Sequence, residues 1–205
     1  ICSPPGKKPS HTVVFIHGRG EYIEKYARFG DDLVDNNIEL ITLDLRGQGA
    51  SEGYPGHIDD YNHYHQDVLH LLNNYVKKSY SLIGHSTGAL VSIGGLARNY
   101  WFPQKIILTS PFISPYQDIN SSPIKRRLLN ILTHIGGSRL RWRKKQTYEE
   151  ATNPFTSCKE LFHKRKKYLY NDEEATFGWI KAGLDEQDFI FDNTSIYQST
   201  TPIHM

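Results

Sequence analysis

The first half of the chain alternates short runs of hydrophobic residues with stretches of helical character. The continuous apolar runs predict strands buried on both faces, and they span residues 12–16, 38–45, 80–83 and 105–109. The segments between them predict helices at 22–33, 61–75 and 87–99, the first two with apolar residues every three or four positions. Strands alternating with helices predict a parallel sheet with helices on both faces, joined by right-handed crossovers.

From residue 110 to about 199 the pattern changes to helical fragments without a strand-like run. Residues 201–205 then resemble the opening of a fifth strand. The sequence therefore predicts three parts. Residues 1–119 form the N-terminal part of an α/β core, residues 120–199 an inserted helical cap, and residues 200–205 the start of the next core strand.

A serine flanked by glycines follows the third predicted strand. Residues 84–88, Gly-His-Ser-Thr-Gly, fit the nucleophile-elbow pattern G-x-S-x-G, in which a strand turns sharply into a helix. Glycines on either side prevent collisions in so tight a turn, and the helix directs N–H groups towards developing negative charge. Residues 49–53 match the same pattern, but Ser51 lies in a polar turn away from its strand. We therefore expect Ser86 to be the nucleophile.

The turn after the first predicted strand, His-Gly-Arg-Gly at 17–20, should lie at the same edge of the sheet as Ser86. We expect the backbone N–H groups of Arg19 and Thr87 to hold an oxyanion; the alternative is that the glycines only make a turn. His85 adjoins Ser86 but should point away from it, so a structural role is expected.

The turn after the second predicted strand carries charged residues of opposite sign. Asp44 and Arg46 are expected to form a local ion pair that fixes this turn.

Composition and charge fit one soluble globular domain with an uneven surface. The 205 residues are 38% hydrophobic and 22% charged, and no apolar stretch approaches the ~20 residues of a membrane-spanning helix. Thirteen of the 24 Lys and Arg residues, but only three of the 22 Asp and Glu residues, lie within 121–170. This basic segment could dock on an anionic membrane. A solvated cap is the preferred interpretation of the charges, and its apolar residues are expected to line an acyl pocket. Nucleic-acid binding is disfavoured because no recognised motif accompanies the charge.

Cysteine usage and the N-terminal residues bear on the compartment. Cys2 and Cys158 are far apart and form neither a zinc signature nor a disulfide framework, which favours free thiols in a reducing compartment. The first residues contain no apolar signal core. We expect a cytoplasmic location, with peripheral attachment to a membrane as an alternative.

Three motifs together resemble a known family. HGRGE, DLRGQGASEG and GHSTGAL occur in the order and spacing of the lysophospholipase and monoacylglycerol lipase group of α/β-hydrolases. Within the cap, residues 153–157, 168–170 and 176–180 are similar to bacterial lysophospholipase L2. The resemblance implies an α/β-hydrolase fold and hydrolysis of a fatty-acyl ester of a small lipid, with neither cofactor nor metal.

The other two members of a catalytic triad are expected beyond Met205. In this fold the order is Ser, acid, His, with the acid after a strand that follows the cap. Residues 201–205 resemble that strand, and the family's leading antiparallel strands are missing before Ser10, so the fold is expected to be incomplete at both ends. A second chain could carry the C-terminal part. The later acids and histidines are not expected to complete the triad; they are Asp118, Asp172, Asp185, Asp188, Asp192, His134, His163 and His204.

Three functions remain open from the sequence. The first is a serine esterase acting on a lysophospholipid or monoacylglycerol through an acyl-enzyme on Ser86. The second is a serine peptidase of the same fold, because the elbow does not distinguish esters from amides. The third is a non-catalytic module that binds a lipid or a protein partner.

Overall fold

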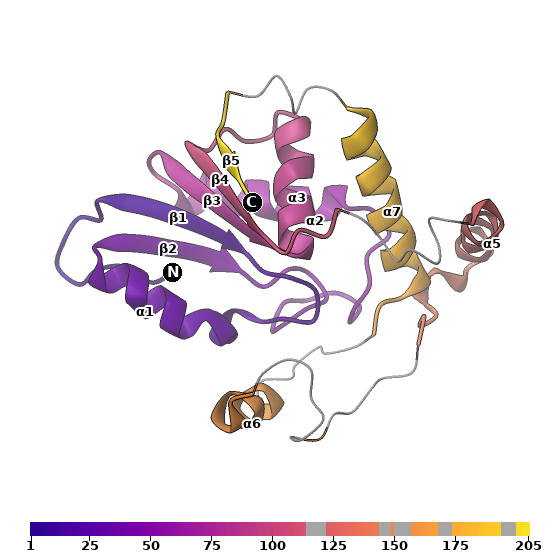
Figure 1. Cartoon of the computed structure of the whole chain (residues 1–205), viewed down its shortest axis with the longest axis horizontal. Coiled ribbons are helices and arrows are strands. Elements are labelled where there is room, and N and C mark those ends of the chain that lie inside the picture. The colour runs from indigo at the N-terminus through magenta and orange to yellow at the C-terminus, as the bar shows by residue number, and fades with distance from the viewer. Residues whose placement is uncertain (114–121, 144–148, 150–156, 168–173, 194–199) are drawn as a thin grey trace.

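A parallel sheet of five strands forms the centre of the molecule (Figure 1). The structure is a computed structural model that describes residues 1–113, 122–143, 149, 157–167, 174–193 and 200–205. The strands lie in the order β2-β1-β3-β4-β5, and every neighbouring pair is parallel. They are β1 (His11–Ile16), β2 (Ile38–Leu43), β3 (Tyr80–His85), β4 (Lys105–Thr109) and β5 (Ile203–His204). The predicted parallel α/β architecture is confirmed.

Alternate residues of the strands supply two hydrophobic layers. Val13, Phe15 and Leu40 point to one face, which a short 3-10 helix, η1 (Ile23–Tyr26), and α1 (Ala27–Asp35) cover. The opposite face is covered by α2 (Asn62–Tyr75) and α3 (Thr87–Ala97). Since side chains alternate across a strand, burial on both faces accounts for the continuous apolar runs in the sequence.

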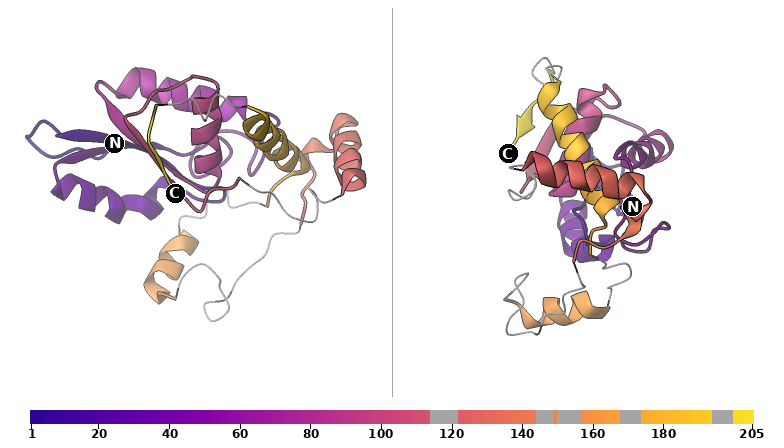
Figure 2. Two further views of the ribbon diagram at one scale, coloured as in Figure 1. Left: turned by 45° about the horizontal axis from the view of Figure 1, so that its top comes forward. Right: turned by 90° about the vertical axis from the view of Figure 1, so that its right-hand side faces the viewer.

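Helices occupy the described parts of the segment between β4 and β5. They are α5 (Pro123–His134), the 3-10 helix η2 (Gly137–Arg139), α6 (Lys159–Lys167) and α7 (Phe177–Asp192). Helix α7 packs on α3, and α5 lies on the outer side of α7, away from the sheet (Figures 1 and 2). The expected boundaries at 119/120 and 199/200 fall outside the described residues, so the division into core and cap stays a prediction.

Helix α5 differs from the expectation that apolar cap residues line an acyl pocket. Of its hydrophobic residues Leu129 is buried, whereas Ile124, Leu128, Ile131 and Ile135 are exposed. The reason is that α5 packs mainly against α7 and η2 among the elements described, which leaves its opposite side in solvent. Within the described ranges, no helix has the length and apolarity needed to cross a bilayer.

The outer edge of β2 carries a feature that the sequence did not predict. Cys2 pairs with Leu40 in an antiparallel bridge, with both N–H···O distances at 2.9 Å. Leading antiparallel strands were predicted to be missing before Ser10, yet the described N-terminal residues already make one antiparallel contact with the sheet.

Candidate active site

Ser86 occupies the sharp junction between β3 and α3. Its backbone has φ 52° and ψ −112°, a conformation that residues with side chains rarely adopt and that costs of order 1–3 kcal/mol. The surrounding sheet fixes this backbone: the Ser86 N–H donates to the carbonyl of Thr109 on β4 at 2.9 Å. The candidate nucleophile is therefore held in a strained turn at the carboxyl edge of the sheet.

The two glycines of the motif are required by close backbone approach. A Cβ on Gly88 would lie 2.1 Å from the carbonyl oxygen of Ile16, and a Cβ on Gly84 would lie 2.7 Å from the Cα of Ala89. Both distances are far below van der Waals contact. The first turn of α3 is thus pressed against the end of β1, and any side chain at either position would force the elements apart.

The loop after β1 lies directly against Ser86. A Cβ on Gly18 would be 3.1 Å from the Cβ of Ser86. The Gly18 N–H donates to Glu21 Oε2 at 2.8 Å, and the Gly20 N–H donates to Gln48 Oε1 at 2.5 Å, so the backbone on both sides of Arg19 is fixed. The sheet order places this loop at its topological switch point, since β2 and β3 flank β1.

The structure therefore brings the three residues singled out in the sequence to one place. Ser86 precedes α3, Thr87 is the first residue of that helix, and Arg19 lies in the loop packed on Ser86. The first N–H groups of a helix have no partner inside the helix, which leaves the Thr87 N–H to meet negative charge in front of the helix.

Glu21, the last residue of HGRGE, organises the loop, a role that was not predicted from the sequence. Its carboxylate accepts hydrogen bonds from the Gly18 N–H, from the Tyr26 hydroxyl at 2.6 Å and from Lys25. Burial alone would raise the pKa of Glu21, but the hydrogen bonds from Lys25 and Tyr26 lower the pKa below its usual value. Glu21 is ionised near neutral pH and holds the loop as a charged acceptor. The signal was its place directly after His-Gly-Arg-Gly.

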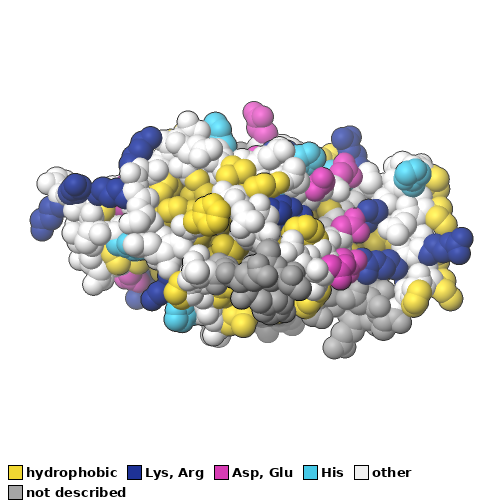
Figure 3. Space-filling view, turned by 90° about the horizontal axis from the view of Figure 1, so that it is seen from above, with side chains coloured by type: hydrophobic (Ala, Val, Ile, Leu, Met, Phe, Trp, Pro, Cys, Tyr) yellow, Lys and Arg dark blue, Asp and Glu magenta, His cyan; other side chains and the backbone are white. Residues whose placement is uncertain are grey.

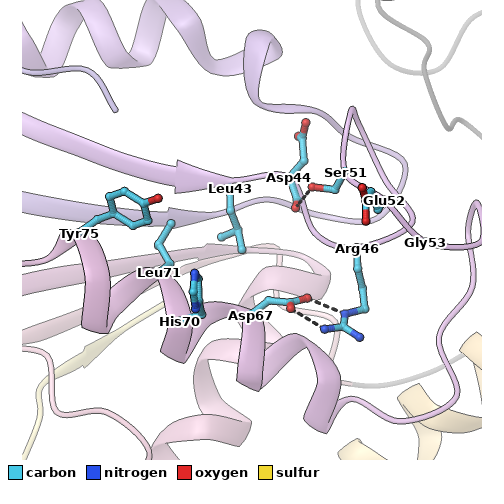
Figure 4. A pocket seen from close by; sticks show the side chains of 10 residues that line it. All are labelled: Leu43, Asp44, Arg46, Ser51, Glu52, Gly53, Asp67, His70, Leu71 and Tyr75. Atoms are coloured by element: carbon cyan, nitrogen blue, oxygen red, sulfur yellow. Dashed lines mark hydrogen bonds and ion pairs between the residues drawn. The ribbon is translucent and has the colours of Figure 1, made fainter.

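The prediction of an ion pair between Asp44 and Arg46 is wrong. The Asp44 carboxylate accepts the N–H groups of Ile23 and Ala50 at 2.8 and 2.9 Å and lies 3.5 Å from His17 Nε2. Its partners therefore come from the segment after β1 and from the turn after β2. Arg46 instead reaches α2, where Nε and Nη2 bond to Asp67 at 2.7 and 2.5 Å (Figure 4).

Ser51 and His85 each form a hydrogen bond with a group other than Ser86. The Ser51 hydroxyl donates to the backbone oxygen of Asp44 at 2.6 Å, within the turn after β2. His85 Nδ1 lies 2.9 Å from the Thr109 hydroxyl on β4, so this ring is engaged away from Ser86.

The remaining triad members stay a prediction. In the part of the chain that the structure describes, no histidine is hydrogen-bonded to the Ser86 hydroxyl. Asp188 pairs with Arg126 and Asp185 pairs with Lys181, both on the cap surface. Asp118 and Asp172 lie outside the described residues.

A pocket of about 550 Å³ lies beside β2 and α2 (Figure 4). Its lining includes the paired Arg46 and Asp67 together with Asp44 and Glu52, but none of Ser86, Arg19 and Thr87. It is therefore separate from the candidate active site.

Known proteins with similar sequences are hydrolases and lipases. The family model described as Hydrolase_4, serine aminopeptidase S33, matches residues 7–204. A probable lysophospholipase L2 of Haemophilus influenzae is 29% identical over 189 residues, which cover 84% of this chain and 59% of the relative. A monoglyceride lipase of Rattus norvegicus is 28% identical over 144 residues, covering 66% and 47% of the two chains. The chain thus spans about half to three fifths of these curated relatives.

Solved structures of low sequence identity share the fold. A soluble variant of monoglyceride lipase from Saccharomyces cerevisiae, in complex with a substrate analog, superposes with a TM-score of 0.74 at 18% identity, covering 98% of this chain and 68% of the other. A monoacylglycerol lipase of Paleococcus ferrophilus gives a TM-score of 0.71 at 17% identity, covering 94% and 70%. The predicted α/β-hydrolase fold is confirmed. Because the family model matches nearly the whole chain, this protein belongs to the Hydrolase_4 family of α/β-hydrolases.

Proposed function

We propose that this protein is a serine hydrolase that cleaves a fatty-acyl ester of a small lipid, a lysophospholipid or a monoacylglycerol, through an acyl-enzyme on Ser86. The observation that carries the proposal is the strained position of Ser86 between β3 and α3, with the Arg19 loop packed against it. The names of the relatives, a probable lysophospholipase and a monoglyceride lipase, support this class of substrate.

The proposed chemistry uses this site together with a histidine base that follows Ser86 along the chain. The Ser86 hydroxyl attacks the ester carbonyl, and the N–H groups of Arg19 and Thr87 stabilise the negative charge on the tetrahedral oxygen. Collapse of that intermediate breaks the bond to the alcohol, which leaves protonated. Water then releases the fatty acid from Ser86. A histidine moves the protons and an aspartate orients it, in the order Ser, acid, His along the chain.

The test is covalent labelling of the full gene product with a fluorophosphonate. We expect stoichiometric labelling and hydrolysis of monoacylglycerol, and both should vanish in Ser86→Ala, because that substitution removes the hydroxyl proposed to form the adduct. Ser51→Ala is the matched control, since Ser51 sits in the second G-x-S-x-G sequence and its hydroxyl donates to the backbone oxygen of Asp44. Absence of labelling in the unsubstituted protein would favour a non-catalytic module that binds a lipid or a protein.

A peptidase is the second candidate, because the matching family model is described as a serine aminopeptidase. The elbow serves acyl transfer from either an ester or an amide. Turnover of an aminoacyl amide faster than a monoacylglycerol by the same Ser86-dependent activity would establish the peptidase and exclude the lipase.

The outer side of α5 supports a docking role for the cap. Ile124, Leu128, Ile131 and Ile135 are spaced by four, three and four residues, so they form one stripe, and their exposed fractions run from 49% to 76%. We call these four residues the α5 stripe. Hydrophobic and basic side chains gather together at this end of the molecule (Figure 3).

Basic residues border the α5 stripe on both sides. At 100° per residue, Lys125 falls on one side of the stripe and Arg127 on the other. Other cations of the cap are engaged internally: Arg126 pairs with Asp188, and Arg141 donates to the carbonyl oxygens of Pro55 and Glu174. We propose that the α5 stripe enters an anionic lipid surface while Lys125 and Arg127 contact its headgroups, each adding about 1 kcal/mol.

Vesicle sedimentation tests this docking. We expect the protein to bind phosphatidylserine-containing vesicles more strongly than pure phosphatidylcholine, with binding that weakens as salt is added. The double variant Leu128→Ser, Ile131→Ser should lose most of the binding. Phe102→Ser is the matched control, because Phe102 is 70% exposed but lies between α3 and β4, far along the chain from α5. Binding that is insensitive to both salt and the double variant would contradict the proposal.

A further inference from the structure

Trp179, on helix α7 of the cap segment, contacts side chains from three other segments of the chain. The Arg19 guanidinium lies 5.4 Å from the centroid of the Trp179 ring, within the range of a cation–π contact. The Phe112 ring stacks on Trp179 at 5.7 Å, and the Tyr61 ring lies at 6.3 Å. A single side chain of the cap segment thus contacts residues from three separate core segments.

Each of the three residues that Trp179 contacts is linked to a group proposed to take part in the reaction. The backbone N–H of Arg19 is the proposed oxyanion donor. The backbone N–H of Phe112 donates to the carbonyl of Ser86 at 3.2 Å. Burial raises the pKa of Tyr61 well above its usual range, and the Thr87 hydroxyl beside it offsets part of that rise. Through these three residues, Trp179 is therefore linked to both proposed oxyanion donors and to the nucleophile.

The ring of Trp179 is held firmly against the core. Its residue is 2% exposed, and its backbone N–H donates at 3.1 Å to the hydroxyl of Thr176, which caps the helix. The same hydroxyl lies 2.7 Å from Nδ1 of the buried His57, in the loop after β2. The ring packs against Tyr61 and Phe112, and the Arg19 guanidinium lies over it.

From this geometry we infer that Trp179 is a positioning residue for the oxyanion loop. By holding the Arg19 guanidinium, it adds to the hydrogen bonds at Gly18 and Gly20 that orient the Arg19 backbone N–H relative to Ser86. The position of α7 then affects how strongly the oxyanion is stabilised. The inference rests on the proposed role of Ser86 and Arg19. It predicts that a change in the cap segment alters the chemical step itself, in addition to any effect on lipid binding.

The experiment uses the full gene product and a short-chain, water-soluble ester, which needs no lipid surface. Active sites are first counted by complete fluorophosphonate labelling, and kcat is expressed per labelled site. Trp179→Ala should lower kcat about tenfold with little change in KM, because a misplaced donor weakens transition-state stabilisation. Trp179→Phe keeps an aromatic face for Arg19 and should retain kcat within about threefold.

A double-mutant cycle separates positioning from general structure. If Trp179 acts through the Arg19 side chain, then Trp179→Ala should cost less than about twofold in an Arg19→Ala background. Trp142→Ala is the matched control, since Trp142 packs edge-on against Phe177 of the same helix; its kcat should not change.

Three results would overturn the inference while Ser86→Ala still abolishes turnover. They are independent, additive losses for Trp179→Ala and Arg19→Ala, a raised KM at unchanged kcat, and a lower count of labelled sites at unchanged kcat per site. Turnover that survives Ser86→Ala would instead overturn the proposed function, and this inference with it.

Discussion

At the residue scale, Gly88 shows why the nucleophile elbow has no room for a side chain at this position. Its missing Cβ would stand 2.1 Å from the carbonyl oxygen of Ile16 and 2.7 Å from that of His17, both backbone atoms that cannot rotate away. We expect Gly88→Ala to lower the free energy of unfolding by about 3 kcal/mol or more, since relief requires α3 to move off β1. Urea denaturation measures this loss, and fluorophosphonate labelling of Ser86 should fall with it.

Gly183 provides the matched control for that substitution. It lies inside α7, where a Cβ would meet only ordinary contacts at 3.5–3.7 Å, and alanine gains about 1 kcal/mol over glycine in a helix interior. Gly183→Ala should therefore keep or slightly raise stability. If Gly88→Ala proved as stable as Gly183→Ala, the close packing of α3 on β1 would be wrong.

Individual site residues were predictable where a local pattern determines their geometry. Ser86 and the loop at Arg19 follow apolar strands directly, and the carboxyl ends of parallel strands share one edge, so their proximity followed from the order of elements. The partner of Asp44 was not predictable in this way. Its oxygens accept N–H groups from Ile23 and Ala50, and Arg46 turns to Asp67 on α2, which depends on how the turn lies in three dimensions.

At the scale of elements, periodicity predicts which residues share a face but not what that face meets. Ile124, Leu128 and Ile131 have the spacing of a core-facing stripe, yet they face solvent because α5 packs on α7 and η2 through Leu129 and its neighbours. For α1 the same kind of stripe, with Phe29 and Leu33, does pack on the sheet. The difference lies in what each helix packs on: α1 lies on the sheet at β2, whereas α5 lies on α7 and η2, and the local sequence does not encode this choice.

At the scale of the whole molecule, a polar cluster joins the cap segment to the core. Glu186 of α7 accepts two hydrogen bonds from Arg98, just after α3, at 2.7 and 2.8 Å, and it lies 3.4 Å from His65 of α2. Gly94 makes room for the carboxylate, because a Cβ there would be 1.8 Å from Glu186 Oε1. Burial and the Arg98 cation lower the pKa of His65 to about 3, so the imidazole is neutral near pH 7 and Arg98 balances the carboxylate.

This cluster makes the attachment of α7 depend on both partners of one ion pair. Glu186→Leu should lower the free energy of unfolding by about 3 kcal/mol, because it leaves the Arg98 cation, only 20% exposed, without its carboxylate. The double variant Arg98→Met, Glu186→Leu should recover most of that loss, since it buries no unpaired charge. Asp185→Asn on the same helix is the control; its pair with Lys181 is exposed and should contribute less than about 0.5 kcal/mol. Urea denaturation of the unsubstituted protein and the three variants measures these free energies of unfolding. If the double variant were as unstable as Glu186→Leu, the loss would come from the packing of the Glu186 side chain. The ion pair with Arg98 would then not be what holds α7 on the core.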